Sequence, residues 1–287
     1  MTAQLSPYQG EKLFQEFGQL LPSKSALTRL STQLGRTWKS EQAQLERLFC
    51  ADITIPEHAV TVSASLDGIM IPLNKDVANG YQTPELGDKP SAQEKKGYQK
   101  KQTKAFYREA SCAAITFYDQ EGERLTTVRF GRMPEAGKKT LKNQLQHSIN
   151  TILSRRPELI LVKLADGAAD NWRFLRNNLC PGQGLEVLDY FHASEHLHEA
   201  MAAAYGKGSA LAIAKYEEYK SLLKNEMGGI EKVINTLKYH SRKKPGNKKL
   251  ATELDYFRNN RHIMQYAQAL KSNYPIGSGV TEATCKT

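Results

Sequence analysis

A near-continuous apolar run at residues 159–165 places the tightest limit on the fold of this chain. Such a run predicts a strand that is buried on both faces of a sheet. A second strand is predicted at residues 60–66, where apolar and polar residues alternate. Each run is followed by an aspartate and a glycine, at Asp67 and at Asp166. The sequence therefore predicts a sheet with an aspartate at the carboxyl end of two strands.

Strands and helices alternate through the middle of the chain. The predicted elements there are strands at 106–118 and 124–130, helices at 135–156 and 169–179, and a short strand at 185–191. About 80 residues of helical pattern follow, at 192–271. A meander of three strands followed by helix, strand, helix, strand and further helices predicts an α/β fold. This order is compatible with a ribonuclease-H-like mixed sheet flanked by helices.

The charge is positive and clustered. The 287 residues carry 40 Lys and Arg against 30 Asp and Glu, a net charge of +10. The basic residues gather at 74–104, 124–142 and 224–249, and such local density favours binding to nucleic acid, although a solvated face is the alternative for any one cluster. The candidates for contact with the DNA backbone are Lys95, Lys96, Lys100, Lys101, Arg242, Lys243, Lys244, Lys248 and Lys249.

The sequence has no apolar run of membrane-spanning length and no signal-peptide pattern at its N-terminus. The four cysteines form no CxxC pair, so neither a zinc ribbon nor a dense disulfide framework is predicted. We therefore expect a cytoplasmic protein with reduced cysteines and no membrane partner.

Asp67, Asp166 and Glu282 could act together as one acidic site. Phosphodiester cleavage by two divalent cations needs carboxylate ligands, and a strand end holds a carboxylate more rigidly than a free loop does. Each residue also has a simpler interpretation. Asp-Gly is a common turn dipeptide, and an acid in the first turn of a helix complements the helix dipole.

Five separated runs, spread over residues 60–287, resemble DDE-type transposases of bacterial insertion sequences, in the group named after the Kra element. The runs are SASLDGIMIP, FYREASCAAITFYDQEGERLTTVRFGRMPE, LVKLADGAADNWRFL, LDYFHASEHL and YPIGSGVTEATCK. The resemblance implies a ribonuclease-H-like domain that uses Mg²⁺, or Mn²⁺ in its place, to cut insertion-sequence ends and join them to target DNA. It implies Asp67, Asp166 and Glu282 as the catalytic, metal-binding triad, with Asp67 bridging both metal ions.

The resemblance also implies a domain organisation. We expect a helical N-terminal region at 1–58, as short helices around a turn at Gly35, that serves as a DNA-binding or structural lead-in. The catalytic core then covers 59–191, a helical insertion covers 192–272, and the helix of the third acid starts within 273–287. The family continues beyond this point, so the resemblance implies a truncated copy that is either an active enzyme or an inactive one.

The segment HASEH leaves three interpretations open for His192, Glu195 and His196. HxxEH is also a zinc-peptidase signature, for which Glu253 or Glu282 could supply a further ligand. In the resembling transposases the block implies a position near the active site or on DNA. The third interpretation is a hydrogen-bonded Glu-His face of a helix.

Two further residues near these blocks also have two interpretations each. Asp189 is either an extra acid of the site or an ordinary strand-end residue. Trp172 either stacks on a base or packs in the core.

Three classes of function follow: a transposase, a DNA-binding transposase remnant without catalysis, and a zinc peptidase. For the first two, the expected partner is double-stranded DNA, both insertion-sequence ends and target. Because joining two ends needs two active sites, we expect a homodimer or a higher oligomer on DNA.

Overall fold

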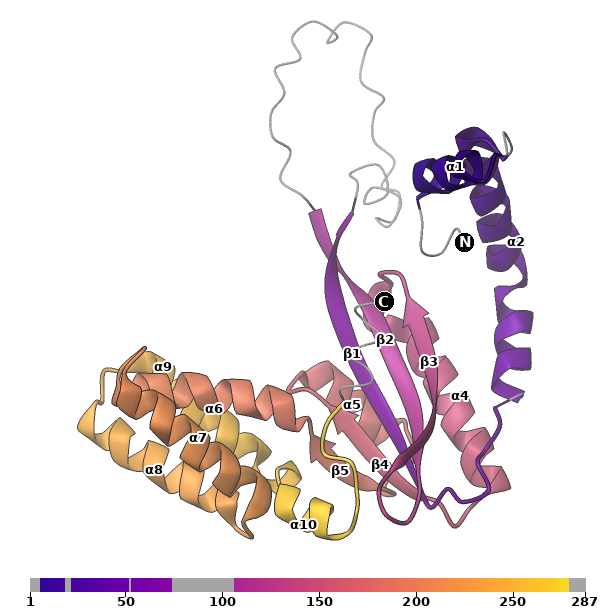
Figure 1. Cartoon of the computed structure of the whole chain (residues 1–287). Helices are drawn as coiled ribbons and strands as arrows, with labels where there is room; N and C mark the ends of the chain where they lie inside the picture. The colour runs from indigo at the N-terminus through magenta and orange to yellow at the C-terminus, as the bar shows by residue number, and fades with distance from the viewer. Residues whose placement is uncertain (1–5, 19–21, 52, 74–105, 279–287) are drawn as a thin grey trace, which may run out of the picture. The chain divides into compact units, whose positions relative to one another are not determined.

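The computed structural model describes residues 6–18, 22–51, 53–73 and 106–278 (Figure 1). The chain divides into two compact units, Met1–Ile53 and Thr54–Thr287. Lys95, Lys96, Lys100, Lys101 and Glu282 lie outside the described residues.

The N-terminal unit consists of helices α1 (Pro7–Glu16) and α2 (Lys24–Ala51). The turn predicted at Gly35 is wrong, because α2 continues through this residue. Its apolar residues keep one helical phase on both sides of the glycine, so a continuous helix satisfies the whole pattern. Near the start of α2, Leu27 is buried and lies against Gly10 of α1.

The second unit contains a mixed five-stranded sheet with the order β3-β2-β1-β4-β5. Its strands are β1 (Thr61–Leu73), β2 (Phe106–Tyr118), β3 (Arg124–Arg132), β4 (Ile160–Ala165) and β5 (Leu185–Leu188). The pairs β1–β2 and β2–β3 are antiparallel, whereas β1–β4 and β4–β5 are parallel. The predicted α/β class with a mixed sheet is therefore confirmed.

Two predicted strand ends are wrong. Strand β1 does not stop at Asp67 but runs on to Leu73, because its antiparallel pairing with β2 continues to Phe106. Its parallel pairing with β4 does stop at Leu66. Up to this residue β1 pairs with both β2 and β4, and from Asp67 onward it pairs, among the strands that the structure describes, with β2 alone. Strand β5 ends at Leu188 rather than at residue 191, because Tyr190 already begins a helix.

Helices cover the sheet as the sequence pattern predicts. A 3₁₀ turn, Ala136–Lys138, leads into α4 (Lys139–Arg155), which packs against β2 and β3. Helix α5 (Ala169–Asn177) packs against β4. The predicted buried face of α4 is confirmed by four core residues, Leu141, Leu145, Ile149 and Ile152.

Four helices form a bundle beside β5: α6 (Tyr190–Tyr205), α7 (Ala210–Asn225), α8 (Gly229–Lys243) and α9 (Lys248–Asn260) (Figure 1). A 3₁₀ turn, Arg261–Ile263, and the short helix α10 (Tyr266–Lys271) follow. Helix α6 contacts α7 and α9, and α8 contacts the same two helices. In the part of the chain that the structure describes, no helix is long and apolar enough to cross a membrane.

Tyr266 is a core residue whose hydroxyl is buried without a hydrogen-bond partner among the described residues. We expect Tyr266→Phe to raise the free energy of unfolding by about 1 kcal/mol near pH 7, because an unsatisfied buried hydroxyl is costly. Burial also raises the pKa of Tyr266 well above its usual range, so this side chain costs stability as the pH rises above about 10, the pKa in the unfolded chain.

Urea unfolding of wild type and Tyr266→Phe near pH 7 and pH 10.5 measures both effects. The exposed Tyr239 supplies the control, Tyr239→Phe. An equal alkaline loss of stability in wild type and in Tyr266→Phe would contradict the prediction.

Candidate active site

Three aspartates occupy corresponding positions on neighbouring parallel strands. Parallel pairing ends at Leu66 opposite Ala165 and at Ala165 opposite Leu188, and the next residues are Asp67, Asp166 and Asp189. The backbone N–H of Asp189 donates to Ala165 at 2.8 Å, which continues the row. Adjacent strands lie about 4.8 Å apart. The structure therefore brings Asp67 and Asp166 side by side.

The end of β4 holds Asp166 through its own loop and the start of α5. Asp166 Oδ1 accepts hydrogen bonds from the backbone N–H of Ala168 and from Nδ2 of Asn171, both at 3.1 Å. Its backbone carbonyl accepts a 2.6 Å hydrogen bond from Trp172 Nε1. Trp172 is only 4% exposed, so base stacking is the wrong interpretation for this residue, and its indole instead fixes the Asp166 turn.

A polar network joins the surroundings of the two neighbouring aspartates. Lys138 Nζ lies 3.3 Å from Asn171 Oδ1 and 2.7 Å from Glu109 Oε1. The Glu109 side chain in turn lies against Gly68, the residue after Asp67, in space that a Cβ at this position would enter. Asp67 Oδ1 accepts a hydrogen bond from the Gly68 N–H at 2.7 Å. Lys138 therefore links the Asp166 turn, through Asn171, to the part of β1 that carries Asp67, through Glu109.

Asn171 is fully buried and contacts both Asp166 and Lys138. We expect Asn171→Ala to lower the free energy of unfolding by about 1–3 kcal/mol, because two partners lose a hydrogen bond in a buried position. Asn177→Ala, at the exposed end of the same helix, is the matched control. Urea unfolding compares the two variants, and equal stability would contradict the role of Asn171.

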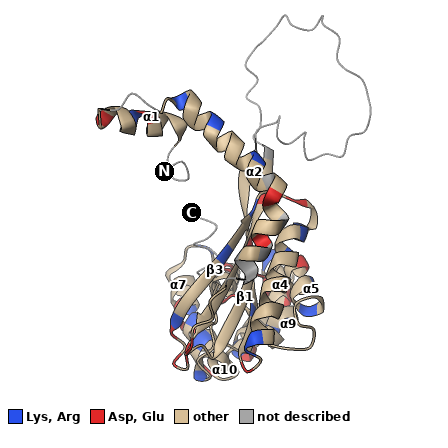
Figure 2. Ribbon diagram, turned by 90° about the vertical axis from the view of Figure 1, so that its right-hand side faces the viewer, with Lys and Arg blue, Asp and Glu red and all other residues tan. Residues whose placement is uncertain are grey.

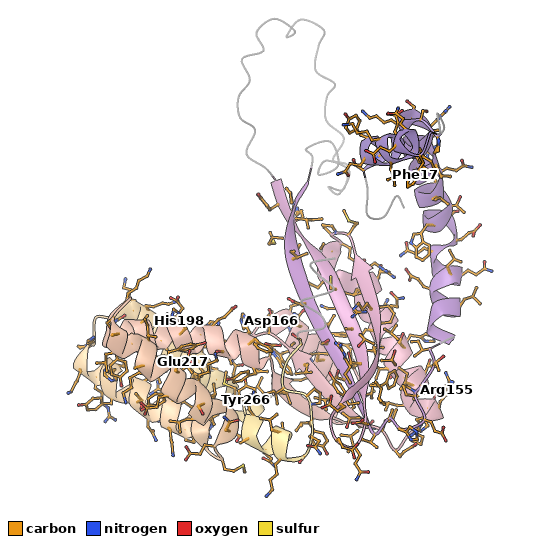
Figure 3. All side chains as sticks on the ribbon, in the orientation of Figure 1. Phe17, Arg155, Asp166, His198, Glu217 and Tyr266 are labelled. Carbon is orange, nitrogen blue, oxygen red and sulfur yellow. The ribbon has the colours of Figure 1, made fainter. Side chains whose placement is uncertain are left out.

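Tyr256 of α9 borders the site from the side of the helical bundle. Its Cε2 lies 3.0 Å from the position that a Cβ on Gly167 would take, so the glycine permits close contact with the ring. The hydroxyl is buried and has no hydrogen-bond partner among the described residues. Burial raises the pKa of Tyr256, as do the carboxylates of Asp166, Glu253 and Asp189. Figure 3 labels Asp166 near the junction of the sheet with the bundle.

The HASEH block lies on α6, and its His196 side chain forms a hydrogen bond with α9. His196 Nδ1 lies 2.7 Å from Oε2 of Glu253, which is 1% exposed, and the His196 ring stacks on Tyr256 at 3.6 Å. His192 Nδ1 lies 3.8 Å from Glu195. A hydrogen-bonded Glu-His pair is therefore present, but its glutamate comes from another helix. Within residues 6–18, 22–51, 53–73 and 106–278, no three His, Cys, Asp or Glu side chains are arranged to hold a metal ion.

The basic cluster at 242–249 lies at the end of the bundle away from the aspartates. Lys244 Nζ donates to the Ala204 carbonyl at 2.8 Å, near the C-terminal end of α6. The 16 residues of α6 span about 24 Å. Lys249 is engaged by Glu253 at 2.8 Å and by Glu199 at 3.5 Å. Arg242, Lys243, Lys244 and Lys248 are exposed, so they remain candidates for a DNA contact distant from the aspartates.

No family model matches this chain, and no curated protein sequence matches it either. The assignment of chemistry therefore depends on the site itself. Two adjacent carboxylates on rigid strands fit a hard divalent cation such as Mg²⁺, which prefers oxygen ligands.

Sequence reasoning missed Glu109, Lys138, Asn171 and Tyr256. Asn171 follows Asp166 by five residues, at the start of a predicted helix, and this was the one local signal. The other three reach the site through pairings that are distant in sequence.

Proposed function

We propose that this protein is a DDE-type transposase whose catalytic domain has a ribonuclease-H-like fold. The observation that carries the proposal is the placement of Asp67 and Asp166 at neighbouring positions, each directly after the last parallel pair of β1 and β4, Leu66 and Ala165. The sheet order β3-β2-β1-β4-β5, with an antiparallel meander followed by two parallel strands, supports the fold. The resemblance of five sequence runs to insertion-sequence transposases supports the reaction.

The proposed site uses Asp67, Asp166 and Glu282 as ligands for Mg²⁺, with Mn²⁺ as a substitute. When bound, the cations would activate the attacking oxygen and stabilise the leaving oxygen of a phosphodiester. Asp67 and Asp166 supply negative charge from neighbouring strands. Asn171 holds the Asp166 turn in place, and Lys138 contacts both Asn171 and Glu109, whose side chain lies against Gly68 of β1. Glu282 enters this proposal from the sequence alone.

Double-stranded DNA is the proposed partner, both as insertion-sequence end and as target. Figure 2 shows Lys and Arg on β3, at the sheet edge next to β2, where Arg124, Arg129 and Arg132 lie. The exposed cluster of Arg242, Lys243, Lys244 and Lys248 would meet duplex about 24 Å away, or roughly seven base pairs from the cleaved bond. A homodimer on DNA would supply the two sites that joining two ends requires, and such an enzyme would act in the cytoplasm at the nucleoid.

The test is cleavage of a supercoiled plasmid that carries the DNA bracketing the reading frame. We expect nicking by wild type with Mg²⁺ or Mn²⁺, none with EDTA, and none by Asp67→Asn. Asp255→Asn, an exposed aspartate of α9, is the matched control and should cut as wild type does.

Salt-sensitive binding of this DNA without cleavage would contradict the enzyme and support the non-catalytic transposase remnant. Equal nicking by wild type and Asp67→Asn would contradict the proposed site.

A further inference from the structure

Both carboxylate oxygens of Asp189 are occupied by donors from the chain itself. Oδ1 accepts the backbone N–H of His192 at 2.9 Å and so caps α6. Oδ2 accepts the backbone N–H of Ser278 at 2.5 Å and its hydroxyl at 2.6 Å. Asp189 is 3% exposed and Ser278 8%. Asp189 is therefore a strand-end residue that follows β5 and caps α6, and both of its carboxylate oxygens are held by the chain itself.

Ser278 ends a segment, residues 273–278, that is fixed along its length. Near its start, Asn273 Nδ2 donates to the Gln120 carbonyl in the turn between β2 and β3, at 3.0 Å. Further on, the Tyr190 N–H donates to the Ile276 carbonyl at 2.9 Å. Gly277 packs so closely on the Phe191 ring that a Cβ would lie 2.9 Å from it. The segment thus runs from the β2–β3 turn to the carboxyl end of β5 (Figure 1).

We propose that Asp189 is a positioning residue whose contact with Ser278 fixes residues 273–278 beside Asp166, at the point from which the sequence continues to Glu282. This inference rests on the proposed function. Asp189 follows β5 at the position next to Asp166, because its N–H donates to Ala165. Glu282 follows Ser278 by four positions in the sequence, a separation that reaches at most about 14 Å. The Asp189–Ser278 contact therefore fixes the chain four positions before the proposed third acid, Glu282.

The test compares wild type with Ser278→Ala and Ser278→Thr in the full chain. Ser278→Ala removes the hydroxyl but leaves Asp189 as the cap of α6, so folding is retained. We expect amide hydrogen exchange at residues 276–278 to rise about tenfold in Ser278→Ala and to return toward wild type in Ser278→Thr. Ser221→Ala, an exposed serine of α7, is the control and should leave this exchange unchanged.

DNA nicking gives the second measurement. Ser278→Ala should lower the maximal nicking rate about tenfold without changing the Mg²⁺ concentration at half-maximal rate, and Ser278→Thr should restore the rate. The inference is overturned if Asp189→Asn raises that Mg²⁺ concentration while Ser278→Ala cuts as wild type does, because Asp189 would then be a metal ligand.

Hydrogen exchange separates this inference from the proposed function. If wild type cuts no DNA, the proposed function fails, and the exchange comparison alone decides whether Asp189 and Ser278 fix the segment. Unchanged exchange in Ser278→Ala overturns the inference whether or not wild type cuts DNA.

Discussion

Asp166→Asn should lower metal-dependent DNA cleavage on the order of a thousandfold, the equivalent of about 4 kcal/mol of lost transition-state stabilisation. Asparagine retains the size of aspartate and an oxygen for the Ala168 and Asn171 donors, but it lacks the negative charge that a divalent cation requires. DNA binding should therefore be nearly unchanged. Single-turnover nicking and a filter-binding assay on the same DNA measure the two quantities.

Asp166→Cys tests direct contact with the metal ion more sharply. A thiolate binds cations softer than Mg²⁺ more readily than it binds Mg²⁺ itself. This variant should therefore be inactive with Mg²⁺ and regain part of its activity with Mn²⁺. The double variant Asp67→Asn/Asp166→Asn should be no slower than either single variant, because both residues serve one site. A double variant whose losses multiply would contradict a shared site.

Glu253→Ala should lower the free energy of unfolding by about 3 kcal/mol. Glu253 is 1% exposed, and its carboxylate binds His196 at 2.7 Å and Lys249 at 2.8 Å. Removing this buried carboxylate opens a void and takes the hydrogen-bond partner from the His196 ring. Urea unfolding measures the loss. The control is Glu217→Ala, at an exposed position of α7 labelled in Figure 3, and an equal change in both variants would contradict the prediction.

The same carboxylate should make stability depend on acid. Burial raises the pKa of Glu253, but the hydrogen bonds with His196 and Lys249 lower it by more than burial raises it. The pKa of Glu253 therefore lies below its ordinary value of 4.5. Its contribution is therefore present above about pH 4.5 and is lost as the pH falls through the lower folded-state pKa. Glu253→Gln should be less stable than wild type near pH 7 and should lose less stability in acid, which urea titrations near pH 7 and pH 3.5 would show.

The local elements were predictable from the sequence because their signals are local. The run at 106–118, followed by a turn at 119–123, predicted a strand with the observed bounds, and one helical stripe predicted the buried face of α4. The α/β class was predictable in the same way, and the two Asp-Gly pairs are visible in the sequence itself. The prediction of a turn at Gly35 was wrong because the apolar phase of α2 outweighs the low helix propensity of a single glycine.

The candidate site depends on pairings that no local pattern contains. Strand order decided that Asp67, Asp166 and Asp189 share one row, and antiparallel pairing with β2 decided that β1 continues beyond Asp67. Packing of α6 on α9 decided that His196 binds Glu253, 57 residues away. The sequence by itself determined which side chains could carry chemistry, because residue type and spacing are local. Only the tertiary structure decided which of them meet, because register and packing are set by contacts between distant segments.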